Sequence, residues 1–185
     1  MKQLYQLIVQ PEEGSETEKD GEEVLANEGV VEEETLFPVI SLNALAGIPS
    51  LRDYNTMRVS GSVMGKKVHI LIDSGSTHNF LDSYIAEKLG CATVKCSPVK
   101  VMVANGETIQ CDKLCSGLKF KMQGVEFQAD LLILPLEGCQ VVLGIQWLVL
   151  LGPIMSDFSQ LRMEFSAGNI KIVLRGSPQP RIQLI

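Results

Sequence analysis

The sequence predicts an all-β fold made mostly of antiparallel strands, with one or two short helices. Short runs rich in Val, Ile, Leu and Phe alternate with turn residues over residues 57–174, which is typical of strands joined by hairpins. Asn105-Gly106 lies between two such runs, and this dipeptide predicts a hairpin with a type I′ turn. Gln123-Gly124 separates the next pair of runs.

The expected elements follow one another along the chain. Strands are predicted at residues 57–63, 67–72, 98–103, 108–111, 118–122, 125–134, 141–143, 154–158, 161–165 and 170–174. A helix at residues 84–89 is indicated by a capping residue before it, Asp82 or Ser83, and by Gly90 after it. A second short helix is predicted over residues 144–151.

Charge divides the chain into unlike parts. Residues 12–34 hold eleven acidic residues and one lysine, a net charge of −10, while the whole chain carries −6. This stretch is poor in large apolar residues and cannot bury enough surface to offset its ordering entropy. We therefore predict an acidic, largely disordered linker over residues 1–50, a folded domain over residues 51–175 and a tail over residues 176–185. A short apolar segment at residues 35–50 either packs on the domain or begins with a short strand.

Composition also excludes several classes of protein. From residue 51 onward, fourteen basic residues stand against eleven acidic ones, without the dense basic stripe of a nucleic-acid-binding domain. The two histidines, His69 and His78, and the absence of a Gly-rich phosphate loop predict no metal and no cofactor. The longest apolar stretch, residues 141–155, is shorter than a membrane span, so no membrane attachment is expected.

The cysteines and the N-terminus indicate the compartment. Five cysteines are present, an odd number without a Cys-x-x-Cys pair, which fits poorly with a disulfide framework. Reduced thiols are typical of cytoplasmic proteins. The apolar run within the first nine residues is too short for a secretory signal peptide. The expected location is therefore cytoplasmic.

The turn that begins at Asp73 is the strongest candidate for a functional site. Asp73 directly follows the apolar strand predicted at residues 67–72, and a carboxylate in such a place needs hydrogen-bond donors. Ser74, Gly75 and Ser76 can supply hydroxyls and backbone N–H groups, and the glycine allows a tight turn. The same residues are also typical of an ordinary Asx turn that closes a strand, and both interpretations stay open at this point.

The context of this turn resembles a known family. The stretches 71–80 (LIDSGSTHNF), 101–107 (VMVANGE), 142–148 (VLGIQWL) and 151–158 (LGPIMSDF) together resemble the retropepsins, the aspartic proteases of retroviruses and LTR retrotransposons. The similarity covers about residues 51–174 and is greatest to the protease domain of plant gypsy-class retrotransposon Gag-Pol polyproteins. It implies a retropepsin-like closed β-barrel, the acid protease fold.

The resemblance also implies an activity and a partner. Asp73, Ser74 and Gly75 would form the catalytic triplet of an aspartic endopeptidase. Such an enzyme needs two carboxylates that share one proton. The sequence holds one Asp-Ser-Gly triplet on a domain of single-domain size, so the second carboxylate would be Asp73 of another copy in a homodimer.

Substrate contacts are implied by the same resemblance. Ser74 or Ser76 would hydrogen-bond across the pair of carboxylates. Polypeptide substrate would be covered by a mobile hairpin, the flap, with Ala104, Asn105, Gly106 and Glu107 at its tip. The glycine that follows the strand at residues 141–143 would let this strand pass under the Asp73 turn.

Two functions from different classes remain open. One is an active aspartic endopeptidase that processes a retrotransposon polyprotein, which the intact Asp-Ser-Gly triplet favours. The other is a catalytically inactive module for dimerisation or peptide binding, left from a decayed retrotransposon. A serine nucleophile at Ser76 beside His78 is a weaker alternative, because neighbouring residues on a turn rarely face each other.

Overall fold

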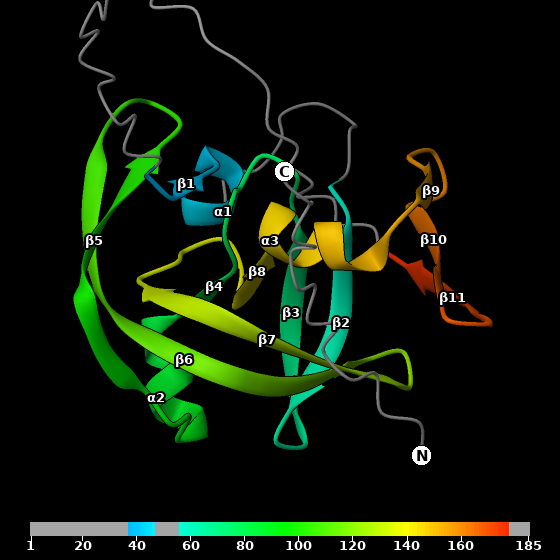
Figure 1. Cartoon of the computed structure of the whole chain (residues 1–185), viewed down its shortest axis with the longest axis horizontal. Helices are drawn as coiled ribbons and strands as arrows, with labels where there is room; N and C mark the ends of the chain where they lie inside the picture. Colours follow the sequence, from blue (N-terminus) through cyan, green and yellow to red (C-terminus); the bar gives the residue numbers. More distant parts are fainter. Residues whose placement is uncertain (1–36, 47–55, 178–185) are drawn as a thin grey trace, which may run out of the picture. The chain divides into compact units, whose positions relative to one another are not determined.

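A closed β-barrel forms the centre of the computed structural model, which describes residues 37–46 and 56–177 (Figure 1). Six strands follow in the order β6-β2-β3-β8-β4-β7, and β7 pairs back with β6 to close the ring. They are β2 (Arg58–Val63), β3 (Lys66–Ile72), β4 (Phe80–Asp82), β6 (Thr108–Met122), β7 (Val125–Leu134) and β8 (Val141–Leu143). The predicted all-β, closed-barrel fold with few short helices is confirmed.

Two further strands extend the sheet beyond β6. β5 (Val94–Val103) pairs antiparallel with β6, and β1 (Val39–Ile40) pairs parallel with the end of β5. Residues 1–36 and 47–50 of the predicted linker, the beginning of the predicted domain at residue 51 and most of the predicted tail lie outside the described residues. Residues 37–46 of that linker are ordered in β1 and α1, so the predicted disorder does not extend over them.

Strand β4 has no counterpart among the predicted strands. Its three residues pair parallel with β7 and antiparallel with β8, and all three are buried. A run of three residues is too short to display an alternating pattern, so no strand was predicted here. This strand is nevertheless needed to close the barrel between β8 and β7.

The predicted strands at residues 108–111 and 118–122 are one continuous strand, β6, so this division was wrong. The register of β6 against β7 shifts between Cys115 and Leu118. Gly117 has a φ of 61° at this bulge, a conformation that glycine adopts readily. The Gly117 N–H donates to Asp130 Oδ1 at 2.6 Å. The bulge bends one long strand, where the sequence suggested a break.

The predicted type I′ turn at Asn105-Gly106 is also wrong. A type I′ turn needs positive φ at both central residues, and in this dipeptide only Gly106 has one, at 90°. The Val103 N–H instead donates to Glu107 O at 2.7 Å, which leaves a loop of three residues. Both positions are positive at Met64-Gly65 and at Gln123-Gly124, where the two-residue turns occur.

The helices are short and lie at the ends of strands. α2 (Ser83–Leu89) begins at Asp82, whose carboxylate accepts from the Ile85 N–H at 2.9 Å, and ends at Gly90 with a φ of 65°, as predicted. The other helical segments are α1 (Leu42–Ala46), α3 (Ile145–Leu148) and the 3₁₀ turn η1 (Val149–Leu151). No helix among the described residues is long and apolar enough to cross a membrane.

The main core joins the barrel to a separate three-stranded sheet. This sheet has the order β11-β10-β9 and consists of β9 (Ile154–Asp157), β10 (Arg162–Ala167) and β11 (Ile170–Arg175). Trp147 packs edge-on against Phe127 of the barrel and Phe165 of β10, with ring centroids 5.6 and 6.3 Å apart. Trp147 is therefore a core residue, and it fixes α3 between the two sheets.

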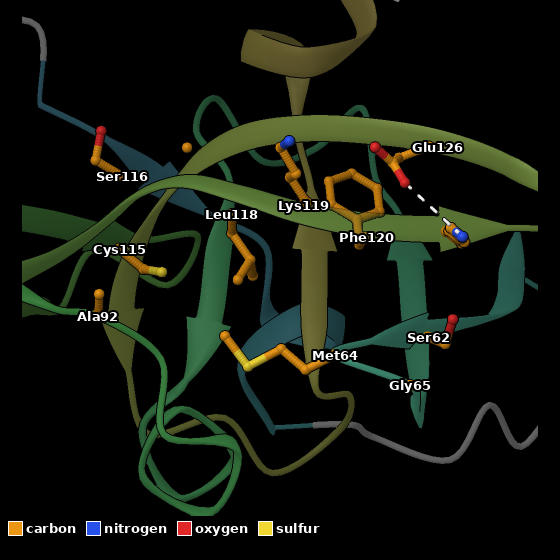
Figure 2. Close-up of a pocket in the computed structure, with 12 residues that line it drawn as sticks. Ser62, Met64, Gly65, Ala92, Cys115, Ser116, Leu118, Lys119, Phe120 and Glu126 are labelled. Atoms are coloured by element: carbon orange, nitrogen blue, oxygen red, sulfur yellow. Dashed lines mark ion pairs between the residues drawn. The ribbon is translucent and has the colours of Figure 1, made fainter. Parts of the chain in front are cut away.

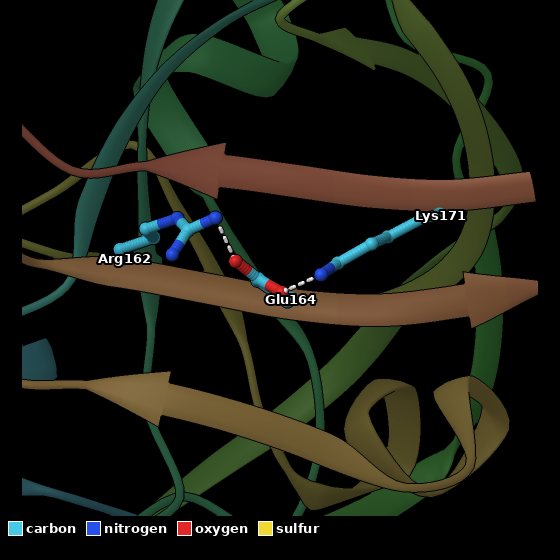
Figure 3. Close-up of polar contacts among 3 residues, drawn as sticks. All are labelled: Arg162, Glu164 and Lys171. Atoms are coloured by element: carbon cyan, nitrogen blue, oxygen red, sulfur yellow. Dashed lines mark ion pairs between the residues drawn. The ribbon is translucent and has the colours of Figure 1, made fainter.

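Strand β10 carries a buried carboxylate that is paired with two basic side chains. Glu164 is 4% exposed and pairs with Arg162 and Lys171, which approach it from both sides (Figure 3). The hydrogen bond from Lys171, aided by the charges of Arg162 and Lys171, lowers the pKa of Glu164 below its ordinary value of 4.5. A lowered carboxyl pKa in the folded state stabilises the fold above the unfolded-state pKa.

Acid should therefore remove the stabilisation that Glu164 provides. The contribution is fully present above about pH 4.5 and is lost as the pH falls through the lower pKa of the folded state. The substitution Glu164→Gln should lower the free energy of unfolding most at neutral pH. In acid, the unfolding free energies of the variant and the wild type should converge. Denaturant unfolding of both at several pH values measures this. A difference that stays constant with pH would contradict it.

The thiols should differ sharply in reactivity. All five cysteines are free, and Cys96 is the one that is not buried. Burial raises the pKa of the Cys139 thiol to about 12 and that of the Cys115 thiol to about 11. Because the thiolate is the reactive form, iodoacetamide at pH 8 should label Cys96 first in the native protein. Peptide mapping that finds Cys139 labelled as fast as Cys96 would contradict this burial.

Candidate active site

The Asp73 turn, residues 73–77, begins where β3 leaves the barrel. The Asp73 N–H donates to Leu143 O at 2.9 Å, so the first residue of the turn is fixed to strand β8. The Ser76 N–H donates to Asp73 O at 3.2 Å and closes the turn. Asp73 is partly exposed, whereas Ser76 is fully buried. The carboxylate is thus held at a fixed place and remains accessible.

Three donors converge on the Asp73 carboxylate. The Gly75 N–H donates to Oδ1 at 3.0 Å, and the Ser76 hydroxyl donates to Oδ2 at 2.7 Å. The third donor is the hydroxyl of Ser41, 2.6 Å from the same Oδ2. Hydrogen bonds of this number and length fix the orientation of a carboxylate. Ser74 lies exposed at the tip of the turn.

Gly144 lies directly beneath the turn. A Cβ atom placed on Gly144 would lie 2.3 Å from His78 O and 2.5 Å from Ser76 O, both backbone atoms. The following N–H of Ile145 donates to Ser76 O at 2.8 Å. The close approach expected for this glycine is therefore present, and it supports the turn from below.

Asn79 ties the same elements together and was not singled out from the sequence. It is 2% exposed, and its Oδ1 accepts from the Gly144 N–H at 3.0 Å. Its Nδ2 donates to Asp130 O at 3.2 Å. A buried amide with both ends paired is a strong positioning element. The signal in the sequence was its place between the Asp73 turn and an apolar pair, Phe80-Leu81.

Ser41 was also missed. It caps α1, because its hydroxyl oxygen accepts from the Ala44 N–H at 3.1 Å while its proton goes to Asp73. Its own N–H donates to Ser76 Oγ at 3.1 Å. Thirty-two residues separate Ser41 from Asp73 in the chain, and no motif links them. This apolar segment was expected either to pack on the domain or to begin with a short strand, and residues 37–46 do pack on it.

The hairpin predicted to be the flap is formed by β5, β6 and residues 104–107 and lies beside this segment. Ala104, Asn105, Gly106 and Glu107 are all exposed at its tip. Within residues 37–46 and 56–177, the polar contacts of the Asp73 carboxylate are with residues 41, 75 and 76, and none comes from this tip. The structure therefore brings Asp73, Gly75 and Ser76 together but keeps the tip apart from them.

A serine nucleophile is not supported by the geometry. The Ser76 hydroxyl donates to Asp73, and the His78 ring nitrogen Nδ1 lies 2.9 Å from Thr77 Oγ1. Burial lowers the pKa of His78. Because Ser76 and His78 have other partners, they do not form the hydrogen-bonded pair that such a nucleophile needs.

A pocket of about 620 Å³ lies elsewhere, along β6 (Figure 2). It is lined mainly by residues 115–121 of β6, with Met64 of the β2–β3 turn across from them and Glu126 of β7 paired with Lys121 at 3.8 Å. None of the residues of the Asp73 turn or the flap tip lines it. This pocket is therefore not part of the candidate active site.

A barrel with one carboxylate on a hydrogen-bonded turn, supported by a glycine from a parallel strand, defines an aspartic-protease-like protein. Residues 55–158 match the family model described as retroviral aspartyl protease. The match spans more than half of the chain, and the chain belongs to this family.

Other comparisons add little beyond the family. No curated protein matches the chain. Among solved structures, the retroviral protease-like domain of Ddi1 from Leishmania major is similar, with a TM-score of 0.48 and 12% sequence identity. That match covers 70% of this chain and 98% of the other.

Proposed function

We propose that this chain is an aspartic endopeptidase whose catalytic pair consists of Asp73 from each subunit of a homodimer. The observation that carries the proposal is the Asp73 carboxylate, which is accessible and oriented by three donors in a member of the retroviral aspartyl protease family. Nothing else among the described residues combines a fixed, accessible carboxylate with the turn of this family.

The chemistry follows from two carboxylates that share one proton. Like charges held close together cannot both ionise, so one carboxyl stays protonated. The ionised Asp73 takes a proton from water, whose oxygen attacks the peptide carbonyl carbon. The protonated Asp73 gives its proton to the carbonyl oxygen. The C–N bond then breaks as the amide nitrogen receives a proton from the carboxyl that took one from water. One hydroxyl of the tetrahedral carbon returns its proton to the other Asp73, which yields the carboxylic acid product and restores the starting pair.

Exposed apolar side chains support dimer formation. β9 is an edge strand of the three-stranded sheet, and exposed edges readily pair with another chain. Large apolar side chains are exposed on η1, on β9 and just after it: Val149, Leu150, Met155 and Phe158 at 66, 64, 61 and 86%. We propose that a second copy covers this surface when the two Asp73 turns meet.

Subunit mixing tests the shared pair. Wild-type chain is mixed with a large excess of the Asp73→Asn variant and allowed to exchange subunits. Most wild-type subunits then pair with a variant subunit, so activity should fall well below that of wild type diluted with buffer. Activity that depends only on the amount of wild type would mean that each subunit works alone. An equal excess of Asp112→Asn, at an exposed position on β6, serves as the control and should raise the total activity, because its own subunits are active.

The substrate and the setting are part of the proposal. We propose a polypeptide substrate and, as natural role, processing of a Gag-Pol polyprotein of a plant gypsy-class LTR retrotransposon. Five free thiols support a reducing, cytoplasmic setting. The alternative is a non-catalytic peptide-binding or dimerisation module. The contact of Ser41 with Asp73 favours it, because this hydrogen bond occupies Oδ2 of the carboxylate.

A further inference from the structure

Residues 38–40 lie between the flap strand β5 and the Asp73 turn and hydrogen-bond to both. On one side, Pro38 O accepts from the Met102 N–H at 2.7 Å and Ile40 O accepts from the Ala104 N–H at 3.2 Å. On the other side, Val39 O accepts from the Thr77 N–H at 2.9 Å. Figure 1 shows β1 beside the end of β5. The carbonyl groups of this extended segment thus alternate between two neighbours, the end of β5 and the Asp73 turn. A bound peptide that adds a strand to a sheet forms hydrogen bonds in the same way.

The side chain of Ile40 is buried completely in the second core cluster of the protein. This cluster draws on the strand before Asp73, on β4, on the flap strand and on the strand before Gly144: Leu71, Phe80, Val101, Val103 and Val142. The elements that frame the candidate active site therefore also enclose Ile40. An apolar side chain held in this way acts as an anchor for the segment.

Ser41 follows the anchor and reaches the carboxylate itself. Its hydroxyl donates to Asp73 Oδ2, and its Cβ lies 3.4 Å from the position that a Cβ on Gly75 would take. The helix α1 then begins, and Leu45 O at its end accepts from the Glu137 N–H at 2.8 Å. Residues 37–46 precede residue 55, where the match to the family begins. They lie outside the matched region and contact the Asp73 turn.

We propose that residues 38–41 are an internal peptide ligand, which occupies the position of a substrate and keeps the site closed until it is displaced. This inference rests on the proposed function, because residues 38–41 occupy the position of a substrate only if the chain is a peptidase. It also names a class of ligand, an extended peptide with a β-branched aliphatic residue followed by a small hydroxyl residue. Such a peptide would replace Ile40 and Ser41 in the same contacts.

Hydrogen exchange measures the occupancy directly, without any need for catalysis. In the full chain, the N–H groups of Met102, Ala104 and Thr77 donate to the segment, whereas the N–H of Val103 donates to Glu107 O within the flap hairpin. The variant Ile40→Asp places a charge in the apolar cluster and should release the segment. Exchange at residues 102, 104 and 77 should then speed up by at least about tenfold, a shift of about 1.4 kcal/mol in the opening equilibrium. Exchange at Val103 should not change.

Peptide binding supplies the second measurement. A synthetic peptide of residues 37–46 should bind the Ile40→Asp chain and restore protection at residues 102, 104 and 77. It should bind the wild-type chain at least about tenfold more weakly, because the tethered segment competes at high effective concentration. The variant Phe37→Ser, at a half-exposed position that starts the segment, should behave as wild type. Equal binding to wild type and Ile40→Asp, or unchanged exchange in Ile40→Asp, overturns the inference.

The outcomes separate this inference from the proposed function. Protection in the β6–β7 ladder reports whether the barrel is intact, and if Ile40→Asp loses it, the milder Ile40→Ala is used with the same criteria. If exchange and binding follow the expectation but no form cleaves peptides, the segment is an internal ligand and proteolysis is refuted. If wild type and Ile40→Asp cleave equally well and bind the peptide equally well, the protease stands and the internal ligand is refuted.

Discussion

Replacing Asp73 by Asn is expected to reduce peptide hydrolysis below detection while the barrel stays folded. One acid–base group contributes on the order of 10²–10⁴-fold to a rate, and in a symmetric dimer the substitution removes both carboxyl groups at once. Cleavage of an unfolded protein in acid by the variant and the wild type measures the loss. Cleavage that survives the substitution would contradict the assignment of Asp73.

The fold should tolerate this substitution because the donors around Asp73 can adapt. The Gly75 N–H can still donate to the amide oxygen, and the hydroxyls of Ser41 and Ser76 can rotate to accept from the amide nitrogen. Stability should therefore change by no more than about 1 kcal/mol. Asp112→Asn, on the exposed face of β6, is the matched control and should leave both activity and stability as they are.

The substitution Gly144→Ala should destabilise the fold severely. The added Cβ would approach His78 O and Ser76 O at 2.3 and 2.5 Å. Ser76 O belongs to the backbone of the turn and His78 O to the residue just after it, and Ser76 O already accepts from the Ile145 N–H. Relief of the clash requires separating β8 from the Asp73 turn and breaking these hydrogen bonds. We expect a loss of about 4 kcal/mol or more in the free energy of unfolding, the range of exceptional substitutions.

A second glycine provides the comparison for this result. Gly65 has a φ of 77° in the β2–β3 turn, and a Cβ there would meet no atom within 4 Å. Gly65→Ala adds backbone strain without a clash and should cost about 1–2 kcal/mol. Denaturant unfolding of the two variants separates the effects. A Gly144→Ala chain as stable as Gly65→Ala would mean that the turn does not need the close approach.

The parts of this fold that local sequence determines could be predicted. An apolar strand before Asp73, the Asp82 cap and the Gly90 end of α2 each depend on neighbouring residues. The Asp73 turn was predicted on the same basis, since its internal hydrogen bonds join residues that are at most three apart. Such short-range features have signals that do not depend on the rest of the fold.

The parts that depend on distant contacts could not be predicted. The hydroxyl of Ser41 is one of many in the chain, and only the path of residues 37–46 across the barrel brings it to Asp73. The same holds for Asn79, which gains its role from Gly144, 65 residues later. The bulge at Gly117 was missed because a single glycine indicates a bend or an end equally well. The type I′ turn predicted at Asn105-Gly106 was wrong because the loop has three residues and includes Ala104.

The most direct test of the central claim is pepstatin-sensitive proteolysis by the purified full chain. Cleavage of an unfolded protein in acid is measured for the wild type and for Ile40→Asp, with and without pepstatin, on samples that sedimentation shows to be dimeric. We predict cleavage that pepstatin abolishes, with the greater rate in Ile40→Asp. Two results would contradict the claim that this chain is an aspartic protease. One is that folded dimers of both forms do not cleave, and the other is that they cleave as fast with pepstatin as without it.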